Sequence, residues 1–136
     1  MKGLLMAYPS NYRYTKEHEW VAPNGKTAKI GISDFAQNQL GDIVFVELPA
    51  VGAELKAGDA LGTVESVKAV SEVFAPVGGK VKAVNDELAK KPELINQDPH
   101  GAAWMVELEL SDPNAANQLM DTPAYEQFIA SAEAAH

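Results

Sequence analysis

Short apolar runs separated by glycines fill the middle of this sequence, and they constrain its fold more than any other feature. Between residues 51 and 85 the turn signals are closely spaced, with glycine at positions 52, 58, 62, 78 and 79. Glycine disfavours a continuous helix, whereas short runs between frequent turn signals are typical of antiparallel strands. This stretch therefore predicts a small sandwich or barrel of strands, with helices confined to its edges.

Strand patterns also precede this stretch. Residues 18–23 and 27–33 lie on either side of Asn24-Gly25, a dipeptide that favours a tight hairpin turn. Apolar side chains alternate along the second segment, so we expect one of its faces to be buried. Residues 44–49 predict a further strand, which Pro49 closes.

A short helix is expected between these strands. Ser33 and Asp34 can cap its start, Gln37 is placed to reach back to the cap from the third helical position, and Gly41 can end it. Residues 85–91 predict one more helical turn.

The last third of the chain predicts one strand followed by helices. Residues 103–110 alternate between apolar and acidic side chains, with Trp104 on the apolar side. Asp112-Pro113 and Asp121-Thr122-Pro123 each place a capping side chain before a proline that suits a first helical position. We expect a single domain over residues 1–136, with a core at about 14–110 and two C-terminal helices at about 113–134.

Charge and cysteine content limit the chemistry of the chain. Its 136 residues include 19 acidic and 11 basic ones, for a formal net charge of −8, and no cysteine. This charge disfavours nucleic acid, and the lack of cysteine excludes disulfides and thiolate catalysis. The three histidines lack the spacing of a metal site, so no metal is expected. The apolar stretch at residues 4–7 is too short for a secretory signal or a membrane span, which favours a cytoplasmic protein away from membranes.

A short internal repeat surrounds Lys68. Residues 51–57 and 77–83 share valine, glycine, lysine and alanine at matching places, and Lys68 lies midway between Leu55 and Val81. Two halves related by an approximate two-fold, with Lys68 at the hairpin tip between them, would give this pattern. Chance similarity in a segment rich in valine, glycine and alanine is the alternative.

The turn around Lys68 lacks the usual turn residues. Alternation on both sides predicts two strands joined at Val67-Lys68-Ala69, with valines instead of asparagine and glycine beside the tip. An exposed lysine is almost wholly protonated at neutral pH and is a poor nucleophile without help. Such a lysine suits attachment of a group by another enzyme. An ordinary solvated lysine remains the alternative at this point.

Several long motifs resemble those of the glycine cleavage system H protein family, from Tyr14 onward. The attachment segment reads GDALGTVESVKAVSEVFAPVGGKV, and further matching segments, in the order of the family, are YTKEHEWV, KIGISDFAQNQLGDIVFVELP and PELINQDPHGAAWMVELEL. A lysine in a glycine-flanked hairpin would by itself suit lipoyl and biotinyl carriers alike. Biotinyl carriers usually have methionine on both sides of the lysine, where this chain has Val67 and Ala69.

The resemblance implies a fold and a cofactor. The fold is a mainly β, antiparallel barrel-sandwich hybrid, like that of lipoyl and biotinyl carriers, with short helices and a helical C-terminus. Lys68 would carry lipoate in amide linkage, on an arm that reaches roughly 14 Å from the backbone. The two sulfur atoms needed for redox chemistry would come from lipoate, because the chain contains no cysteine. The chain would be a carrier, not an enzyme.

The resemblance also implies partners. A pyridoxal-phosphate-dependent glycine decarboxylase would load an aminomethyl group, and an aminomethyltransferase would pass its carbon to tetrahydrofolate and release ammonia. Dihydrolipoamide dehydrogenase would reoxidise the arm, and a lipoate ligase or an octanoyltransferase would attach it. We expect a monomer that docks transiently and partly through charge.

Site residues follow from matching positions in the family. A loaded arm decomposes in water, so a surface cleft would protect it. The resemblance implies Glu19 and Glu72 as partners of the amine, Ile32 as an apolar wall, and Val67 and Ala69 beside the attachment point. Glu17 stands where some relatives have serine.

Two other functions remain open at this stage. One is an H-like lipoyl carrier that relays lipoate to other acceptors or serves sulfur oxidation, because the attachment segment does not separate these roles. The other is an enzyme that uses Lys68 as a base or Schiff-base former, which the protonation of an exposed lysine disfavours.

Overall fold

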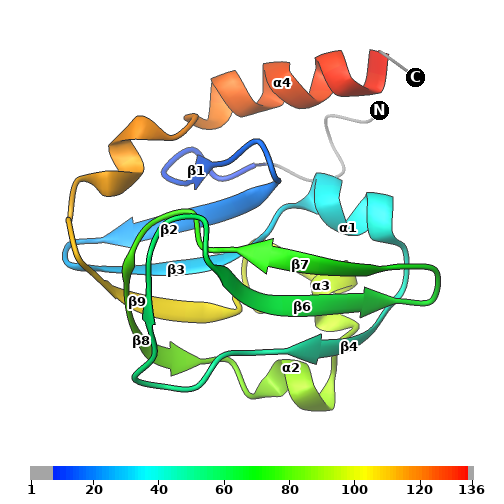
Figure 1. Ribbon diagram of the computed structural model, residues 1–136. Helices are drawn as coiled ribbons and strands as arrows, with labels where there is room; N and C mark the ends of the chain where they lie inside the picture. Colours follow the sequence, from blue (N-terminus) through cyan, green and yellow to red (C-terminus); the bar gives the residue numbers. More distant parts are fainter. Residues whose placement is uncertain (1–7, 135–136) are drawn as a thin grey trace.

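The computed structural model describes residues 8–134, and within this range it forms two antiparallel sheets that lie one in front of the other (Figure 1). The strands of the six-stranded sheet, in spatial order, are β1 (Arg13–Tyr14), β2 (Glu19–Asn24), β3 (Thr27–Ile32), β9 (Val106–Leu110), β8 (Gly79–Val84) and β5 (Glu54–Leu55). Those of the three-stranded sheet are β4 (Ile43–Glu47), β6 (Ala60–Ser66) and β7 (Val70–Phe74). The mainly β prediction is confirmed, and the two sheets stay open instead of closing into a barrel.

The helices are short and lie at the edges of the sheets (Figure 1), as predicted. They are α1 (Asp34–Leu40), α2 (Glu87–Lys90), α3 (Leu94–Gln97), η2 (Ala115–Gln118) and α4 (Thr122–Ala134). The first of the two expected C-terminal helices is only the 3-10 turn η2, and α3 was not anticipated. No helix among the described residues is long and apolar enough to cross a membrane. The apolar stretch at residues 4–7 lies outside the described range.

The two sheets share one hydrophobic core. Ile30 of β3 and Leu108 of β9 are buried together with Val64 of β6 and Val73 of β7. Alternate residues on a strand point to opposite faces, so these side chains all come from the inner faces of their sheets. Packing between the sheets therefore holds β6 and β7, which carry Lys68 at their connection, against the body of the protein.

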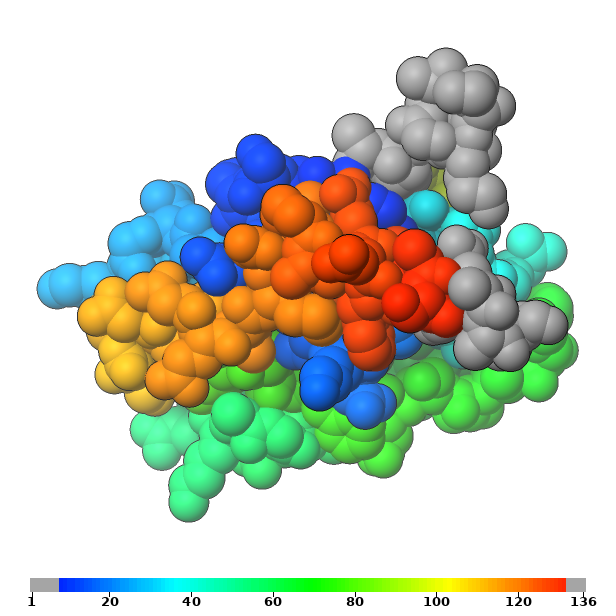
Figure 2. All heavy atoms as spheres, turned by 90° about the horizontal axis from the view of Figure 1, so that it is seen from above, coloured from blue at the N-terminus to red at the C-terminus, as the bar shows by residue number. Residues whose placement is uncertain are grey.

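A second, aromatic cluster joins the C-terminal helix to β1 and β2. The rings of Tyr14 and Tyr125 stack with centroids 4.5 Å apart, and Trp20 is buried beside them. Figure 2 shows α4, in orange and red, lying across the blue N-terminal strands. Trp104, expected within the last strand, precedes β9 and packs partly buried on this cluster. Because Trp104 joins a cluster formed by distant residues, the local alternation pattern misplaced it.

The two copies of the internal repeat pair with each other. Glu54 of β5 lies opposite Lys80 of β8, and these residues occupy the same place in the two copies. The N–H of Gly52 donates to the carbonyl of Val81 at 2.8 Å, and the N–H of Val81 donates to the carbonyl of Ala53 at 2.8 Å. A strand that meets its own copy in antiparallel register has a local two-fold axis through the matching pair. This pairing supports the predicted symmetry around Lys68.

The predicted caps of α1 are present at both ends. Ser33 Oγ accepts the N–H of Ala36 at 3.3 Å, and Gly41 ends the helix with a positive φ of 85°. Gln37 does not reach back to the N-cap, because the N–H of Ser33 already donates to the carbonyl of His18. The Gln37 side-chain amide donates instead to Asp34 at 2.8 Å.

Candidate functional site

Lys68 lies on the exposed turn between β6 and β7, as the sequence predicts. Ser66 is the last residue of β6 and is buried, whereas Val67, Lys68, Ala69 and Val70 are all exposed. The carbonyl of Ala69 accepts the N–H of Ser66 at 2.8 Å, which closes the turn. The turn thus lifts one amine and its two apolar neighbours clear of the core.

The side chain of Ser66 takes the place of a turn-forming asparagine or glycine. Its Oγ accepts the N–H groups of Lys68 at 3.2 Å and of Ala69 at 3.0 Å. Small polar side chains commonly satisfy turn amides in this way. A buried serine therefore lets exposed valines stand beside Lys68.

The turn contacts the segment that directly follows α1. The N–H of Val67 donates to the carbonyl of Asp42 at 3.0 Å. A Cβ atom at Gly41 would lie 3.4 Å from Lys68 Cε and 4.0 Å from Nζ. The lysine side chain therefore passes close over Gly41, directly after Leu40 of α1.

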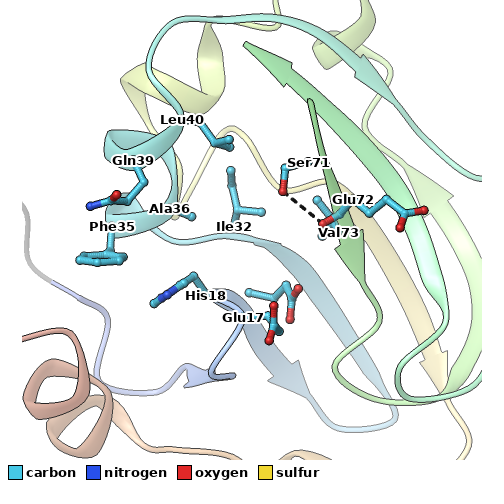
Figure 3. Close-up of a pocket in the computed structure, with 11 residues that line it drawn as sticks. Glu17, His18, Ile32, Phe35, Ala36, Gln39, Leu40, Ser71, Glu72 and Val73 are labelled. Carbon is cyan, nitrogen blue, oxygen red and sulfur yellow. Dashed lines mark hydrogen bonds between the residues drawn. The ribbon is translucent and has the colours of Figure 1, made fainter. Parts of the chain in front are cut away.

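A cleft of about 390 Å³ begins beside this point, between α1 and β7. Figure 3 shows Leu40 and Ala36 of α1 and Ile32 of β3 on one side, with Ser71 and Val73 of β7 on the other. A strand advances about 3.3 Å per residue, so Ser71 and Val73 lie at most about 10 and 17 Å along the chain from Lys68. An arm of roughly 14 Å on Lys68 can therefore enter the cleft along β7.

Glu19 is buried at the base of the cleft and bridges two segments. Thr15 Oγ1 donates to its Oε1 at 2.6 Å, and the N–H of Phe74 donates to its Oε2 at 3.2 Å. Burial raises the pKa of the Glu19 carboxyl above its ordinary value, and these two hydrogen bonds oppose the rise. The nearby negative charge of Glu17 raises this pKa further. A cation entering the cleft would relieve both effects.

Of the other predicted site residues, some line the cleft and others do not. Ile32 is buried and forms part of the cleft wall, together with Glu19. Glu72 also borders the cleft, but its side chain is exposed and extends from β7 away from the cavity (Figure 3). Val67 and Ala69 flank Lys68 on the turn and do not line the cleft.

His18 was not predicted as a site residue, yet it lines the cleft. Its Nδ1 lies 2.8 Å from the hydroxyl of Tyr125 on α4, and that hydroxyl lies 2.6 Å from Ser33 Oγ. Burial lowers the pKa of His18, which favours the neutral ring, and the negative charge of Glu17 opposes this shift. The backbone of His18 has a positive φ of 72°, which is uncommon outside glycine. The contact with Tyr125 spans most of the chain, so no local sequence signal could reveal it.

No group of histidine, aspartate or glutamate residues within the described range could hold a metal ion. The chemistry that the residues do support is attachment at Lys68 and shelter of a cationic group in a cleft with apolar walls and a carboxylate base.

Comparisons with known proteins identify the family of this chain. Residues 12–132 match the family model described as Glycine cleavage H-protein. A glycine cleavage system H protein from Acidobacterium capsulatum is 59% identical over 91% of this chain and 95% of its own length. One from Koribacter versatilis is 59% identical over 96% of this chain and 100% of its own length.

A solved structure is also similar over most of the fold. The crystal structure of a glycine cleavage system H protein from Mycobacterium marinum matches with a TM-score of 0.83 and 33% identity. The match covers 90% of this chain and 99% of that one. On sequence and fold together, the chain belongs to the glycine cleavage H-protein family.

Proposed function

We propose that this protein carries lipoate on Lys68 and shelters an aminomethyl cargo in the cleft between α1 and β7 while moving it between enzymes. H proteins are carrier components of the glycine cleavage system, so the chain is a carrier protein and not an enzyme. The observation that best supports the site is that Lys68 stands exposed beside Gly41 and Leu40, where the cleft begins, so that an arm of roughly 14 Å can enter the cleft past Ser71.

The residues around Lys68 fit an attached arm. The amine is exposed for acylation, and Gly41 leaves room beside Cε and Nζ where a larger residue would crowd them. Lipoate, once attached, supplies a disulfide that can be reduced and a sulfur that can hold the aminomethyl group. The chain supplies position, because the turn fixes where the arm starts and β7 leads it into the cleft.

The apolar and the acidic residues of the cleft protect the cargo in different ways. Ile32, Leu40 and Val73 contribute apolar surface that excludes water from the cargo. Glu19 contributes a desolvated carboxylate that favours an ammonium partner, since burial strengthens charge pairing. We assign Glu72 a secondary part in holding the amine, through movement of its exposed side chain into the cleft.

Partners follow from the chemistry of the cargo. A pyridoxal-phosphate-dependent glycine decarboxylase loads the arm, a tetrahydrofolate-dependent aminomethyltransferase unloads it, and dihydrolipoamide dehydrogenase reoxidises it. A lipoate ligase or an octanoyltransferase modifies Lys68 beforehand. The net charge of −8 suits docking to basic surfaces by a monomer in the cytoplasm.

Intact mass spectrometry tests the attachment. The full chain is expressed in cells supplied with lipoate, and a lipoyl-sized mass increase is expected in the wild type and absent in Lys68→Arg. Lys56→Arg is the matched control, because Lys56 is also exposed and also stands beside a turn. If Lys68→Arg keeps the modification while its circular dichroism is unchanged, the attachment site is wrong.

A second experiment tests the carrier role and the cleft. With added glycine decarboxylase, lipoylated wild type should support exchange of bicarbonate with the carboxyl group of glycine, and Lys68→Arg should not. Glu19→Gln should shorten the lifetime of the loaded form more than Glu72→Gln does, because Glu19 is the buried carboxylate. Equal lifetimes in Glu19→Gln and wild type would remove Glu19 from the amine site.

A further inference from the structure

Four large apolar side chains are exposed next to Lys68. Val44, Phe45, Val67 and Val70 have exposed fractions of 49%, 54%, 68% and 66%. Exposed apolar residues are ordinary one at a time, but a cluster on a small protein marks a contact surface. We call these four residues the apolar patch.

Strand register places two members of the patch, Phe45 and Val70, on the outer face of the three-stranded sheet. Phe45 of β4 and Val70 of β7 both lie opposite Glu65 of β6, so the three side chains form one row across the sheet. Their neighbours Val46 and Val64 are buried, which shows that the row points outward. In Figure 1 this sheet lies in front of the six-stranded one. The bond from Val67 to Asp42 keeps the tip beside the start of β4, so the patch is continuous with Lys68.

Carboxylates surround the patch. Asp42, Glu47, Glu65 and Glu72 are exposed around it, and Lys68 is the only basic residue in segments 42–49 and 60–75. Within the part of the chain that the structure describes, none of these carboxylates forms an ion pair. The surface is therefore an apolar centre with an acidic rim and a single amine, and it complements an apolar hollow rimmed by lysine or arginine.

We infer that the apolar patch is the docking surface for the enzyme that acylates Lys68. This inference rests on the proposed attachment at Lys68. Enzymes that act on the finished arm meet its end, roughly 14 Å from the backbone. The acylating enzyme meets a chain with no arm and must bring its acyl donor to Nζ itself. It therefore has to touch the surface immediately around the turn, and the patch is what the chain presents there.

Acylation of Lys68 forms one bond and breaks one bond at the acyl carbon. The Lys68 nitrogen bonds to the acyl carbon of a lipoyl adenylate, and the bond from that carbon to the phosphate oxygen breaks. AMP leaves with the bonding electron pair, and the ammonium loses two protons to base and solvent. No redox change occurs, so the patch contributes only binding and position.

Matched valine substitutions test the inference. Val70→Thr changes the patch, and Val51→Thr makes the same change at a residue of similar exposure, 63%, beside Lys80 and Glu109 of the other sheet. Threonine keeps the shape and strand propensity of valine. Phe45→Thr is the stronger patch variant. Each unmodified full chain is acylated by purified lipoate ligase with ATP and lipoate, and the modified fraction is followed by intact mass.

The expected result is a fall in kcat/KM of about tenfold for Phe45→Thr and about threefold for Val70→Thr, mainly through KM. Val51→Thr should match the wild type, and the wild-type rate should fall with salt because the rim is charged. The inference is overturned if Phe45→Thr and Val70→Thr, folded by circular dichroism, are acylated as efficiently as Val51→Thr. It is also overturned if they lose only transfer with the glycine-cleaving enzymes. Modification of Lys68→Arg would instead overturn the proposed function, so the two failures are distinguishable.

Discussion

Replacing Ser66 by alanine should loosen the Lys68 turn without unfolding the protein. Ser66 is 5% exposed, and its Oγ accepts the N–H groups of Lys68 and Ala69. The substitution removes the acceptor of both amides, and also the longer bond of 3.3 Å that Oγ donates to the Ala69 carbonyl, but it leaves the bond from the Ser66 N–H to that carbonyl in place. One bond therefore still closes the turn, while its two central amides lose their partners.

The size of the effect follows from where these amides lie. A typical intramolecular hydrogen bond contributes about 0.5–1.5 kcal/mol, and the freed amides of an exposed turn can bond to water. The low part of that range applies, so the two bonds together contribute about 1–2 kcal/mol. Local opening should then become about 5- to 30-fold more frequent.

Amide hydrogen exchange measured by NMR gives the opening at each residue. Exchange at Lys68 and Ala69 should speed up by this factor in Ser66→Ala, whereas amides in β3 should keep their wild-type rates. Ser71→Ala is the matched control, because among the described residues its hydroxyl makes only a 3.4 Å hydrogen bond, to the Glu72 carbonyl. A change of less than twofold at Lys68 and Ala69 would refute the claim that Ser66 holds the turn.

Three further predictions concern other parts of the fold. A Cβ added at Gly31 would lie 2.7 Å from Cζ2 of the buried Trp20, so Gly31→Ala should destabilise the protein by about 1–3 kcal/mol in urea unfolding, and an unchanged midpoint would contradict this overlap. Burial raises the pKa of Glu19 above 4.5, so its protonated form adds stability at low pH that is lost as pH rises through the folded-state pKa. Glu19→Gln should therefore flatten the pH dependence of unfolding above about pH 4.5, and a slope equal to that of wild type would count against a desolvated carboxylate. Burial lowers the pKa of His100 below 6.5, and its Nε2 accepts the N–H of Asp34. The neutral ring therefore contributes stability above pH 6.5 that should be lost as the pH falls through the lowered pKa. An NMR titration midpoint of His100 at or above 6.5 would contradict this prediction.

Local signals predicted the parts of the fold that depend on neighbours in the chain. Asn24-Gly25 does join β2 to β3, Ser33 and Gly41 do cap α1, and the turn at Lys68 does separate β6 from β7. Each of these features is decided within a few residues, by backbone preference and short-range hydrogen bonds. They are therefore readable from one sequence.

Features that depend on distant residues were missed or misplaced. Trp104 packs on an aromatic cluster assembled from both ends of the chain, so its alternation with Val106 was misleading. The Gln37 side chain bonds to Asp34 and not to the N-cap amide, because the N–H of Ser33 donates to the carbonyl of His18, which comes from another turn. The first C-terminal helix shortened to η2, because capping residues mark where a helix can start and not how long it lasts.

The candidate site shows the same division. Lys68 was singled out from its turn, but its role as the attachment point, like the roles of Glu19, Ile32 and Glu72, came from family resemblance. The structure brings Glu19 and Ile32 to one cleft and points the carboxylate of Glu72 outward, and their roles toward the amine stay predictions. His18 required the packing of α4 to be recognised, since Tyr125 fixes its ring.

The bond between Glu19 and Phe74 has a consequence beyond the cleft. β7 is the last strand of its sheet, and an unpaired edge strand can recruit a strand from another molecule and start aggregation. The Glu19 carboxylate occupies the N–H of Phe74 at this edge and places a charged group where an incoming backbone would have to lie. Glu19 thus also satisfies a backbone N–H on the open edge of this sheet, and a residue without a side-chain acceptor at this position would leave that edge N–H unpaired.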